Sequence, residues 1–399
     1  MGKNRRCCGY RSFRMRRPVY GMIACAFGIA TLTSAEELTS VIQRLQVPGN
    51  FTLELMEIAL EEQGFQMIRP DHPHICYTGR IDWTDAKRPV IIWQGTEIRL
   101  RFTGSQVGFV FSEGRDRNFF NVIVDGKVRS FSLVAGEKQT YLVAGLEPGE
   151  HEISLFKRSE AMFGNSRFEG FLLPSGEKSL APTPRPFKIE FYGDSITAGA
   201  CNEIEPSVTD HYEDLMLHNN YTSYGALCTR RLGADYVNVA YSGIGISLSW
   251  HPLRMPEVWD KLYPRDDSPR YDFSTPDPDM VVVNLGQNDF GYAEHIKVPF
   301  PADFVDRYVA FLRALRKQYP HAWIILASGG MSGVKSSRPL LKGLQDVYKA
   351  LSKEDNRLLT YTFKAFTYAH PRVETHEKLA HELEEFIRKS GIIEKIERE

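Results

Sequence analysis

Four short segments of the chain carry residue types that together can catalyse acyl transfer. FYGDSITAGA places Ser195 two residues beyond an apolar run, and YAHPRVETHEKLAHEL places His370 just before Pro371. A serine hydroxyl is a weak nucleophile until a nearby base takes its proton, and histidine supplies that base near neutral pH. Two further segments carry hydrogen-bond donors suited to an oxyanion, Gly243 in VAYSGIGIS and Asn288 in VVVNLGQNDF. Such donors stabilise a tetrahedral intermediate by about 2.7–4 kcal/mol each, so the four segments predict a serine hydrolase.

These segments fall within residues 187–399, which alternate between strand-like and helix-like stretches. The apolar runs are FKIEFYG, DYVNVAYSG, PDMVVVNLG and AWIILASGG, and amphipathic stretches lie between them. Fully apolar strands separated by amphipathic helices predict an α/β/α fold, a doubly wound parallel sheet covered on both faces. Ligands bind at the carboxyl ends of the strands in such sheets. We therefore expect Ser195, Gly243, Asn288 and His370 to meet at that edge.

The part of the chain before this region has a different pattern. Residues 68–174 hold many short β-rich runs separated by turn pairs such as Asp125-Gly126, which predicts a β-sandwich of jelly-roll type. Residues 175–186, SGEKSLAPTPRP, contain three prolines and few apolar residues, as is typical of a linker. Residues 36–67 are expected to form two short amphipathic helices broken at Pro48-Gly49, and no role is assigned to them.

Length and charge limit the classes of protein to which the chain can belong. With 399 residues, 42% of them hydrophobic, and a formal net charge of -1, the sequence predicts a globular protein of about two domains with no basic excess for nucleic acid. Its first 35 residues hold seven basic residues, no acidic one and the uncharged run VYGMIACAFGIATLTSA. This pattern predicts a secretory signal peptide over residues 1–35, an exported protein and no stable membrane insertion after cleavage. The alternative is an anchor that stays attached, or a lipid on Cys25.

The cysteines predict neither a disulfide framework nor a metal site. Cleavage near Ala35 leaves Cys76, Cys201 and Cys228, an odd number without the CxxC or Cys/His spacing of a zinc site. We therefore expect no metal and no other cofactor.

The four segments resemble, in the same order, the four sequence blocks of the SGNH (GDSL-like) hydrolase superfamily: GDSIT, the glycine block at Gly243, GQND and His370. The preceding β-rich region narrows this resemblance. WQGTEIRLRFTGSQVGFVF, NVIVDG and YPHAWIILASGGM are similar to carbohydrate esterase family 2, over about residues 68–386. Members of that family join an N-terminal jelly roll to an SGNH domain and remove acetyl groups from plant polysaccharides such as xylan and mannans. The resemblance implies an exported serine esterase that acts on acetylated polysaccharides or oligosaccharides through an acyl-enzyme.

The resemblance also implies a role for each site residue. Ser195 corresponds to the nucleophile and His370 to the general base and acid. The amides of Ser195 and Gly243, with the side chain of Asn288, correspond to the oxyanion hole. Many members of the superfamily place an aspartate three residues before the histidine, but Thr367 stands there in this chain. Some members of the resembled family lack this acid and use a backbone carbonyl instead, so we expect a Ser-His dyad.

Other carboxylates and aromatic side chains leave alternatives open. Asp289 or Glu374 could supply a triad acid from elsewhere in the chain. Trp250 is the candidate for stacking on a sugar ring, because it lies close in sequence to Gly243. Core packing and sugar contact compete as explanations for three further aromatic residues, Trp259, Phe290 and Tyr292.

Two other functions compete with polysaccharide deacetylation. A different SGNH esterase or lipase would act on other acyl esters, and a long acyl chain would need an apolar trough. No extra apolar insertion accompanies the four segments. A non-catalytic carbohydrate-binding protein would keep the fold without the chemistry. For the β-sandwich, polysaccharide binding and structural support are both open.

Overall fold

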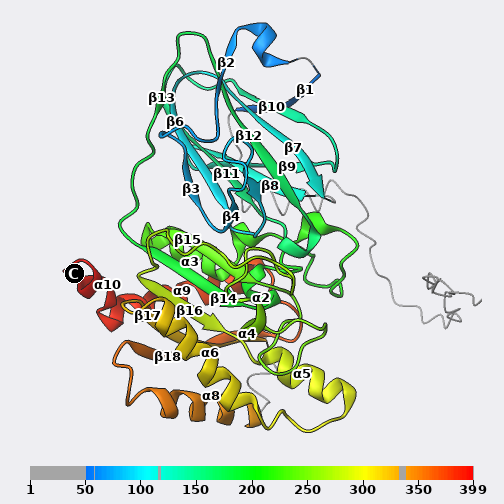
Figure 1. Ribbon diagram of the computed structural model, residues 1–399. Coiled ribbons are helices and arrows are strands. Elements are labelled where there is room, and N and C mark those ends of the chain that lie inside the picture. The colour runs from blue at the N-terminus through cyan, green and yellow to red at the C-terminus, as the bar shows by residue number, and fades with distance from the viewer. Residues whose placement is uncertain (1–50, 58, 116–117, 332–337, 399) are drawn as a thin grey trace, which may run out of the picture.

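The computed structural model describes residues 51–398, except residues 58, 116–117 and 332–337. The expected signal peptide, residues 1–35, and the first of the two helices expected within residues 36–67 lie outside the described residues. Figure 1 shows two stacked units, a β-sandwich above and an α/β unit below.

The β-sandwich consists of two antiparallel sheets with an apolar core between them. Its strands are β1 (Thr52–Met56), β2 (Phe65–Ile68), β3 (Cys76–Thr78), β4 (Ile81–Asp82), β5 (Val90–Ile91), β6 (Glu97–Gly104), β7 (Val107–Arg115), β8 (Asn118–Val124), β9 (Lys127–Leu133), β10 (Gln139–Ala144), β11 (Gly149–Lys157), β12 (Asn165–Pro174) and β13 (Ser179–Leu180). One sheet has the order β1-β10-β7-β12-β5-β4, with β2 also on β12, and the other β13-β6-β11-β8-β9, with β3 also on β6. Alternate side chains point inward, and Phe109, Phe111, Phe120 and Phe131 contact one another in the core. The predicted sandwich is confirmed.

The prediction of a second helix within residues 36–67 is wrong. This stretch forms β1, a 3-10 turn over Leu60–Gln63 and β2, and the two strands extend the larger sheet by pairing with β10 and β12. Gly64, at φ 83°, ends the turn in a left-handed conformation. Leu60 is fully buried against Val110 and Leu172. The apolar residues here find burial on an existing sheet, which outweighs local helix propensity.

A five-stranded parallel sheet forms the centre of the α/β unit, in the order β15-β14-β16-β17-β18. The strands are β14 (Lys188–Gly193), β15 (Asp235–Ala240), β16 (Met280–Asn284), β17 (Trp323–Met331) and β18 (Leu358–Thr367). The helices are α2 (Ser195–Ala198), α3 (Tyr224–Leu232), α4 (Met255–Val258), α5 (Gln287–Ile296), α6 (Phe304–Gln318), α8 (Arg338–Leu351), α9 (Val373–Ser390) and α10 (Ile392–Ile396).

Both faces of this sheet are covered by helices. Val281 and Val283 of β16 pack in one apolar cluster with α4, α6 and α8, whereas Met280 and Val282 pack in another with α3 and α9. The four residues are completely buried, as the fully apolar run in the sequence predicted. The expected α/β/α architecture with a central parallel sheet is confirmed.

A buried arginine of the sandwich ties the two units together. Arg80 donates from Nη2 to Glu190 Oε1 and to Tyr192 OH, both at 2.8 Å. Further hydrogen bonds from Arg80 Nη1 to the carbonyl oxygens of Trp259 and Lys261 help to offset the cost of burying this ion pair. Trp93 of the sandwich adds its ring to the apolar cluster of α4 and α6. The expected linker is also attached to the sandwich, because β13 pairs with β6.

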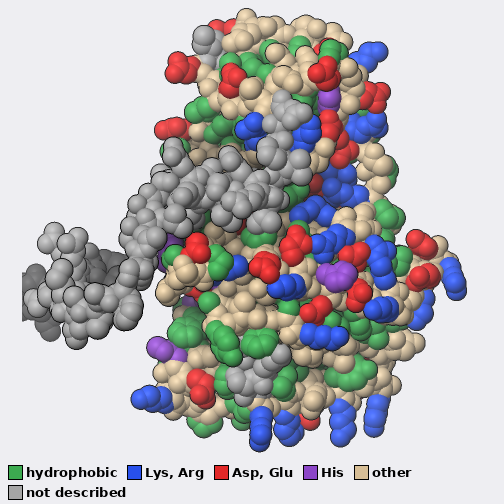
Figure 2. Space-filling model, turned by 180° about the vertical axis from the view of Figure 1, so that it is seen from behind, with side chains coloured by type: hydrophobic (Ala, Val, Ile, Leu, Met, Phe, Trp, Pro, Cys, Tyr) green, Lys and Arg blue, Asp and Glu red, His purple; other side chains and the backbone are tan. Residues whose placement is uncertain are grey.

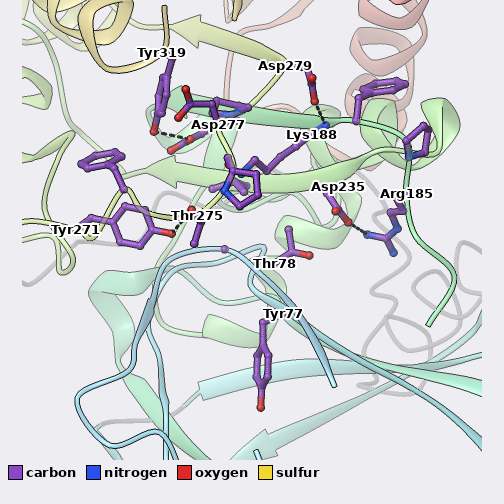
Figure 3. A pocket seen from close by; sticks show the side chains of 18 residues that line it. Tyr77, Thr78, Arg185, Lys188, Asp235, Tyr271, Thr275, Asp277, Asp279 and Tyr319 are labelled. Carbon is purple, nitrogen blue, oxygen red and sulfur yellow. Dashed lines mark hydrogen bonds and ion pairs between the residues drawn. The ribbon is translucent and has the colours of Figure 1, made fainter. Parts of the chain in front are cut away.

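A cavity of about 380 Å³ lies where the strands of the parallel sheet begin, and Figure 3 shows its lining. Lys188, Asp235 and Asp279 line it beside the starts of β14, β15 and β16. Two of its carboxylates already have partners, since Asp279 Oδ2 accepts from the backbone N–H of Lys188 at 2.8 Å and Asp235 Oδ1 accepts from Arg185 at 3.3 Å. This cavity is therefore at the edge opposite to the one expected to hold the site.

Acidic and basic side chains are interspersed over the face shown in Figure 2, as a net charge of -1 allows. Basic side chains gather at the end of that face farthest from the sandwich. Among the described residues, no helix has both the length and the apolar character that crossing a bilayer requires.

Candidate active site

Ser195 is the first residue of the short helix α2 and directly follows the tight turn that ends β14. Asp194 caps the helix, with its Oδ1 accepting from the N–H of Ile196 at 3.0 Å. Gly193 makes the turn possible, because a Cβ there would lie 2.0 Å from Oγ1 of Thr197. Within the described chain neither the N–H nor the Oγ of Ser195 has a hydrogen-bond partner. Ser195 thus combines a hydroxyl and a free amide donor at the carboxyl end of a central strand.

The glycine block follows β15 and comes next to this turn. Gly243 has a left-handed φ of 81°, and a Cβ there would lie 3.2 Å from Cβ of Trp250. Its N–H has no partner among the described residues. Asp289, fully buried, accepts hydrogen bonds from the backbone N–H groups of the next turn, those of Ile246, Ser247 and Leu248, at 2.9, 2.6 and 2.9 Å.

Asp289 is therefore a structural clamp on the glycine block. Burial raises the pKa of Asp289 to about 6, and its three backbone hydrogen bonds oppose that rise. The alternative in which it orients His370 is wrong, because its oxygens are taken up by this turn. Glu374, the other alternative, pairs with Lys378 at 2.8 Å on the exposed face of α9 and is wrong as well.

Asn288 connects the glycine block with the serine turn. It lies in the first turn of α5, and its Nδ2 donates to Ile244 O at 2.8 Å and to Asp194 Oδ2 at a longer 3.3 Å. Burial raises the pKa of Asp194 to about 7, and the positive charge of His370 acts against that rise. The hydrogen bond to Asp194 is the longer and therefore the weaker of the two.

His370 lies between β18 and α9 and is paired with a carboxylate that sequence reasoning missed. Asp210 Oδ2 accepts from Nδ1 of His370 at 2.7 Å and from its backbone N–H at 2.9 Å. Arg372 donates to the other oxygen of Asp210, Oδ1, at 2.7 Å. The expectation that no carboxylate accompanies His370, and hence the dyad, is wrong. Asp210 comes from the loop between α2 and α3, 160 positions away in sequence, and no motif marks it there.

The electrostatics of this pair favour an imidazolium. Burial lowers the pKa of His370, but hydrogen bonds with Asp210 and Cys201 and the negative charge of Asp210 outweigh it and raise the pKa to about 9. Burial also opposes ionisation of Asp210, yet its bonds from His370 and Arg372 hold its pKa well below its usual range. Thr367 has a structural task nearby, since its Oγ1 donates to Ala369 O at 2.7 Å in the turn that leads to His370.

The structure brings the four predicted residues to one edge but leaves one contact open. Among the described residues, no hydrogen bond joins Ser195 Oγ to His370. Instead a ring nitrogen of His370, a carboxylate oxygen of Asp210 and Sγ of Cys201 lie within 4.8 Å of one another. Catalytic hydrogen bonds in unliganded enzymes are often open and close when substrate binds. The spacing of the cysteines gave no sign of this cluster.

The β-sandwich supplies part of the support for the site. Glu160 is buried and accepts from Ser242, the residue before Gly243, through the backbone N–H at 3.1 Å and through Oγ at 2.6 Å. Arg158 donates to Glu203 and to Met216 O of the loop that carries Asp210. Of the two roles left open for the sandwich, structural support is therefore observed.

Aromatic side chains flank the glycine block. Trp250 is 49% exposed, and its backbone N–H donates to Gly243 O at 3.0 Å. The centre of its ring lies 5.1 Å from the centre of the Tyr292 ring. Tyr212, 43% exposed, comes from the Asp210 loop and interacts with Ser242. By contrast, Trp259 is buried and Phe290 half-buried in the apolar cluster of α4 and α6, so both belong to the core.

Comparison with known proteins agrees with this geometry. Residues 77–184 match the carbohydrate esterase 2 N-terminal family, and residues 191–390 match the GDSL-like lipase/acylhydrolase family. The chain is 37% identical over 270 residues to the cellulase/esterase CelE of Acetivibrio thermocellus, covering 65% of this chain but only 32% of that larger protein. It is 30% identical over 255 residues to an acetylxylan esterase / glucomannan deacetylase of Cellvibrio japonicus, covering 60% of this chain and 68% of the relative.

A solved esterase structure is similar to this chain over nearly its full length. The family two carbohydrate esterase from Clostridium thermocellum in complex with cellohexaose superposes with a TM-score of 0.70 at 32% identity, covering 80% of this chain and 99% of that one. Both units of the fold are therefore shared with that structure. The chain belongs to carbohydrate esterase family 2, with a GDSL-like acylhydrolase domain.

Proposed function

We propose that the protein is an exported serine esterase that removes O-acetyl groups from plant polysaccharides of the xylan or mannan type, or from their oligosaccharides. The observation that carries the proposal is the Asp210–His370 pair at the sheet edge that also holds Ser195 and two unoccupied amide donors. The names of the esterase and deacetylase relatives support the substrate class. The Arg-rich start of the sequence supports export.

In this proposal His370 acts first as a base. Ser195 Oγ forms a bond to the acetyl carbonyl carbon, and its proton passes to Nε2 of His370. This step requires the Ser195 hydroxyl and the His370 imidazole to come within hydrogen-bond distance. Asp210 keeps the other proton on Nδ1 and stabilises the imidazolium that forms. Because Arg372 and the backbone N–H of His370 also bind Asp210, the carboxylate is fixed before the reaction starts.

The negative charge on the former carbonyl oxygen then meets three donors. These are the N–H groups of Ser195 and Gly243 and the Nδ2–H of Asn288. The bond between the acetyl carbon and the sugar oxygen breaks, and His370 returns its proton to that oxygen. A water molecule, deprotonated by His370, next attacks the acetyl-serine, and acetate leaves as Ser195 regains its hydrogen.

Acetate release decides between this proposal and its alternatives. We expect the purified chain to release acetate from acetylated xylan or acetylated glucomannan, and to prefer acetate over octanoate among small esters. Ser195→Ala should abolish turnover and keep the melting temperature, whereas Ser207→Ala, at an exposed serine of the Asp210 loop, should leave the rate unchanged. A preference for octanoate, or equal rates for wild type and Ser195→Ala, would contradict the proposal.

A further inference from the structure

Cys201 lies inside the candidate active site but takes no part in the reaction above. Its backbone is left-handed, with φ 55°, which non-glycine residues rarely adopt. The N–H of Cys201 donates to Nδ1 of buried His218 at 3.2 Å, and its Sγ lies 3.5 Å from the carbonyl oxygen of His211. The side chain is fully buried. The fold therefore keeps this thiol in one defined place beside His370.

Three metal-ligating atoms converge at that place. The Sγ of Cys201, one oxygen of Asp210 and one ring nitrogen of His370 all lie within 4.8 Å of one another. In a tetrahedral zinc site with bonds of about 2.0–2.3 Å, neighbouring ligand atoms are about 3.4 Å apart. Closing the observed triangle onto an ion requires movements of about 1 Å, which small side-chain rotations provide.

The chemistry of the three ligands favours a borderline-soft cation. Thiolate and imidazole bind zinc, whereas calcium and magnesium prefer sites made only of oxygen atoms. A thiolate and a carboxylate supply two negative charges, of which Arg372 already neutralises a part at Asp210 Oδ1, and a fourth position stays free for water. Access is open although Cys201 is buried, because the side chains of His370 and Asp210 are 16% and 21% exposed.

We propose that Cys201, Asp210 and His370 form an inhibitory site for zinc or a similar divalent cation. Binding releases two protons to solvent, the thiol proton of Cys201 and the proton on the His370 nitrogen that becomes a ligand, and forms bonds from Sγ, that nitrogen and an Asp210 oxygen to the ion. The effect on hydrolysis rests on the proposed function, because the ion occupies the imidazole that must accept the proton of Ser195. The site itself does not depend on that function.

Metal binding is measured on the full chain after treatment with a chelator. With cobalt as the probe, wild type should show a thiolate-to-cobalt absorption band and bind one equivalent more than Cys201→Ser. Zinc should displace the cobalt, with an affinity at least about tenfold higher in wild type than in Cys201→Ser, since even the loss of a supporting residue costs about 10–100-fold. Because the chain has six cysteines, Cys76→Ser, at a half-buried thiol of β3, is the matched control and should behave as wild type. Equal binding by wild type and Cys201→Ser would overturn the site.

Hydrolysis of a small acetate ester forms the second arm. Each variant is compared with its own metal-free rate, and zinc should inhibit wild type and Cys76→Ser at least about tenfold more strongly than Cys201→Ser. A protein that hydrolyses the ester but shows no Cys201-dependent cobalt band overturns the metal site and leaves the esterase proposal standing. A Cys201-dependent cobalt band in a protein without hydrolytic activity supports the metal site and overturns the esterase proposal.

Discussion

Replacing Asp210 by asparagine tests the reasoning about His370 most directly. The pKa of His370 is raised from 6.5 to about 9. At 1.36 kcal/mol per pKa unit, this corresponds to about 3 kcal/mol of stabilisation of the imidazolium. The same imidazolium forms when Ser195 loses its proton, so Asp210→Asn should lower kcat/KM by about 10²-fold or more where His370 starts neutral.

The pH dependence of kcat/KM shows whether Asp210 raises the pKa of His370. A raised pKa means that His370 is protonated at neutral pH, so kcat/KM of wild type should rise with pH until about pH 9. In Asp210→Asn the hydrogen bond and charge that raise the pKa of His370 most are lost while burial still lowers it, so this limb should move to lower pH although Cys201 stays in place. The ratio of the wild-type kcat/KM to that of Asp210→Asn should therefore be more than about tenfold smaller at pH 7 than at pH 9.5.

The assay is initial-rate hydrolysis of a water-soluble acetate ester across this pH range. Ser195→Ala supplies the blank for spontaneous hydrolysis at alkaline pH. Glu374→Gln, which removes an exposed carboxylate paired only with Lys378, is the matched control and should follow wild type. The reasoning is refuted if Asp210→Asn keeps more than about a third of kcat/KM near pH 9.5, or if its deficit is the same at every pH.

Three further substitutions separate the parts of the site. Asn288→Ala should lower kcat by about 10²–10³-fold with little change in KM, as loss of one oxyanion donor does; a change in KM alone would speak against that role. Glu160→Gln replaces one of the two oxygens that accept from the N–H and Oγ of Ser242 by an NH2 donor and should lower kcat by up to about 10²-fold, whereas a purely structural contact would change only the melting temperature. Trp250→Ala should raise KM by about threefold to tenfold for acetylated oligosaccharides and leave a small acetate ester unaffected; equal effects on both would exclude a sugar platform.

Much of the fold was readable from local sequence pattern. The apolar run at β16 predicted a doubly covered strand, because a strand buried on both faces has no polar side chains to place. The turn at Gly193 and Ser195 was likewise visible, since a serine directly after such a strand lies at the edge where ligands bind. Residues 51–67 were misread because their apolar residues fit a short helix as well as an edge strand, and only the neighbouring β10 and β12 decided between them.

The partners of the site residues could not be read in this way. Asp210 and Glu160 come from irregular segments in which neither periodicity nor spacing distinguishes one carboxylate from another. They bind His370 and Ser242 across 160 and 82 sequence positions. Likewise, nothing about Cys201 in the sequence indicates that its thiol faces the same histidine.

The sequence by itself determined the two-unit architecture, the family likeness and the four segments that the sheet carries to one edge. The roles of Ser195, His370, Gly243 and Asn288 in catalysis remain predictions, of which the assays above test all but that of Gly243. Only the tertiary structure decided which carboxylate holds His370 and which residue of the sandwich holds the glycine block. The physical reason is that backbone patterns are encoded locally, whereas a hydrogen bond between two loops exists only after the sheet has brought those loops together.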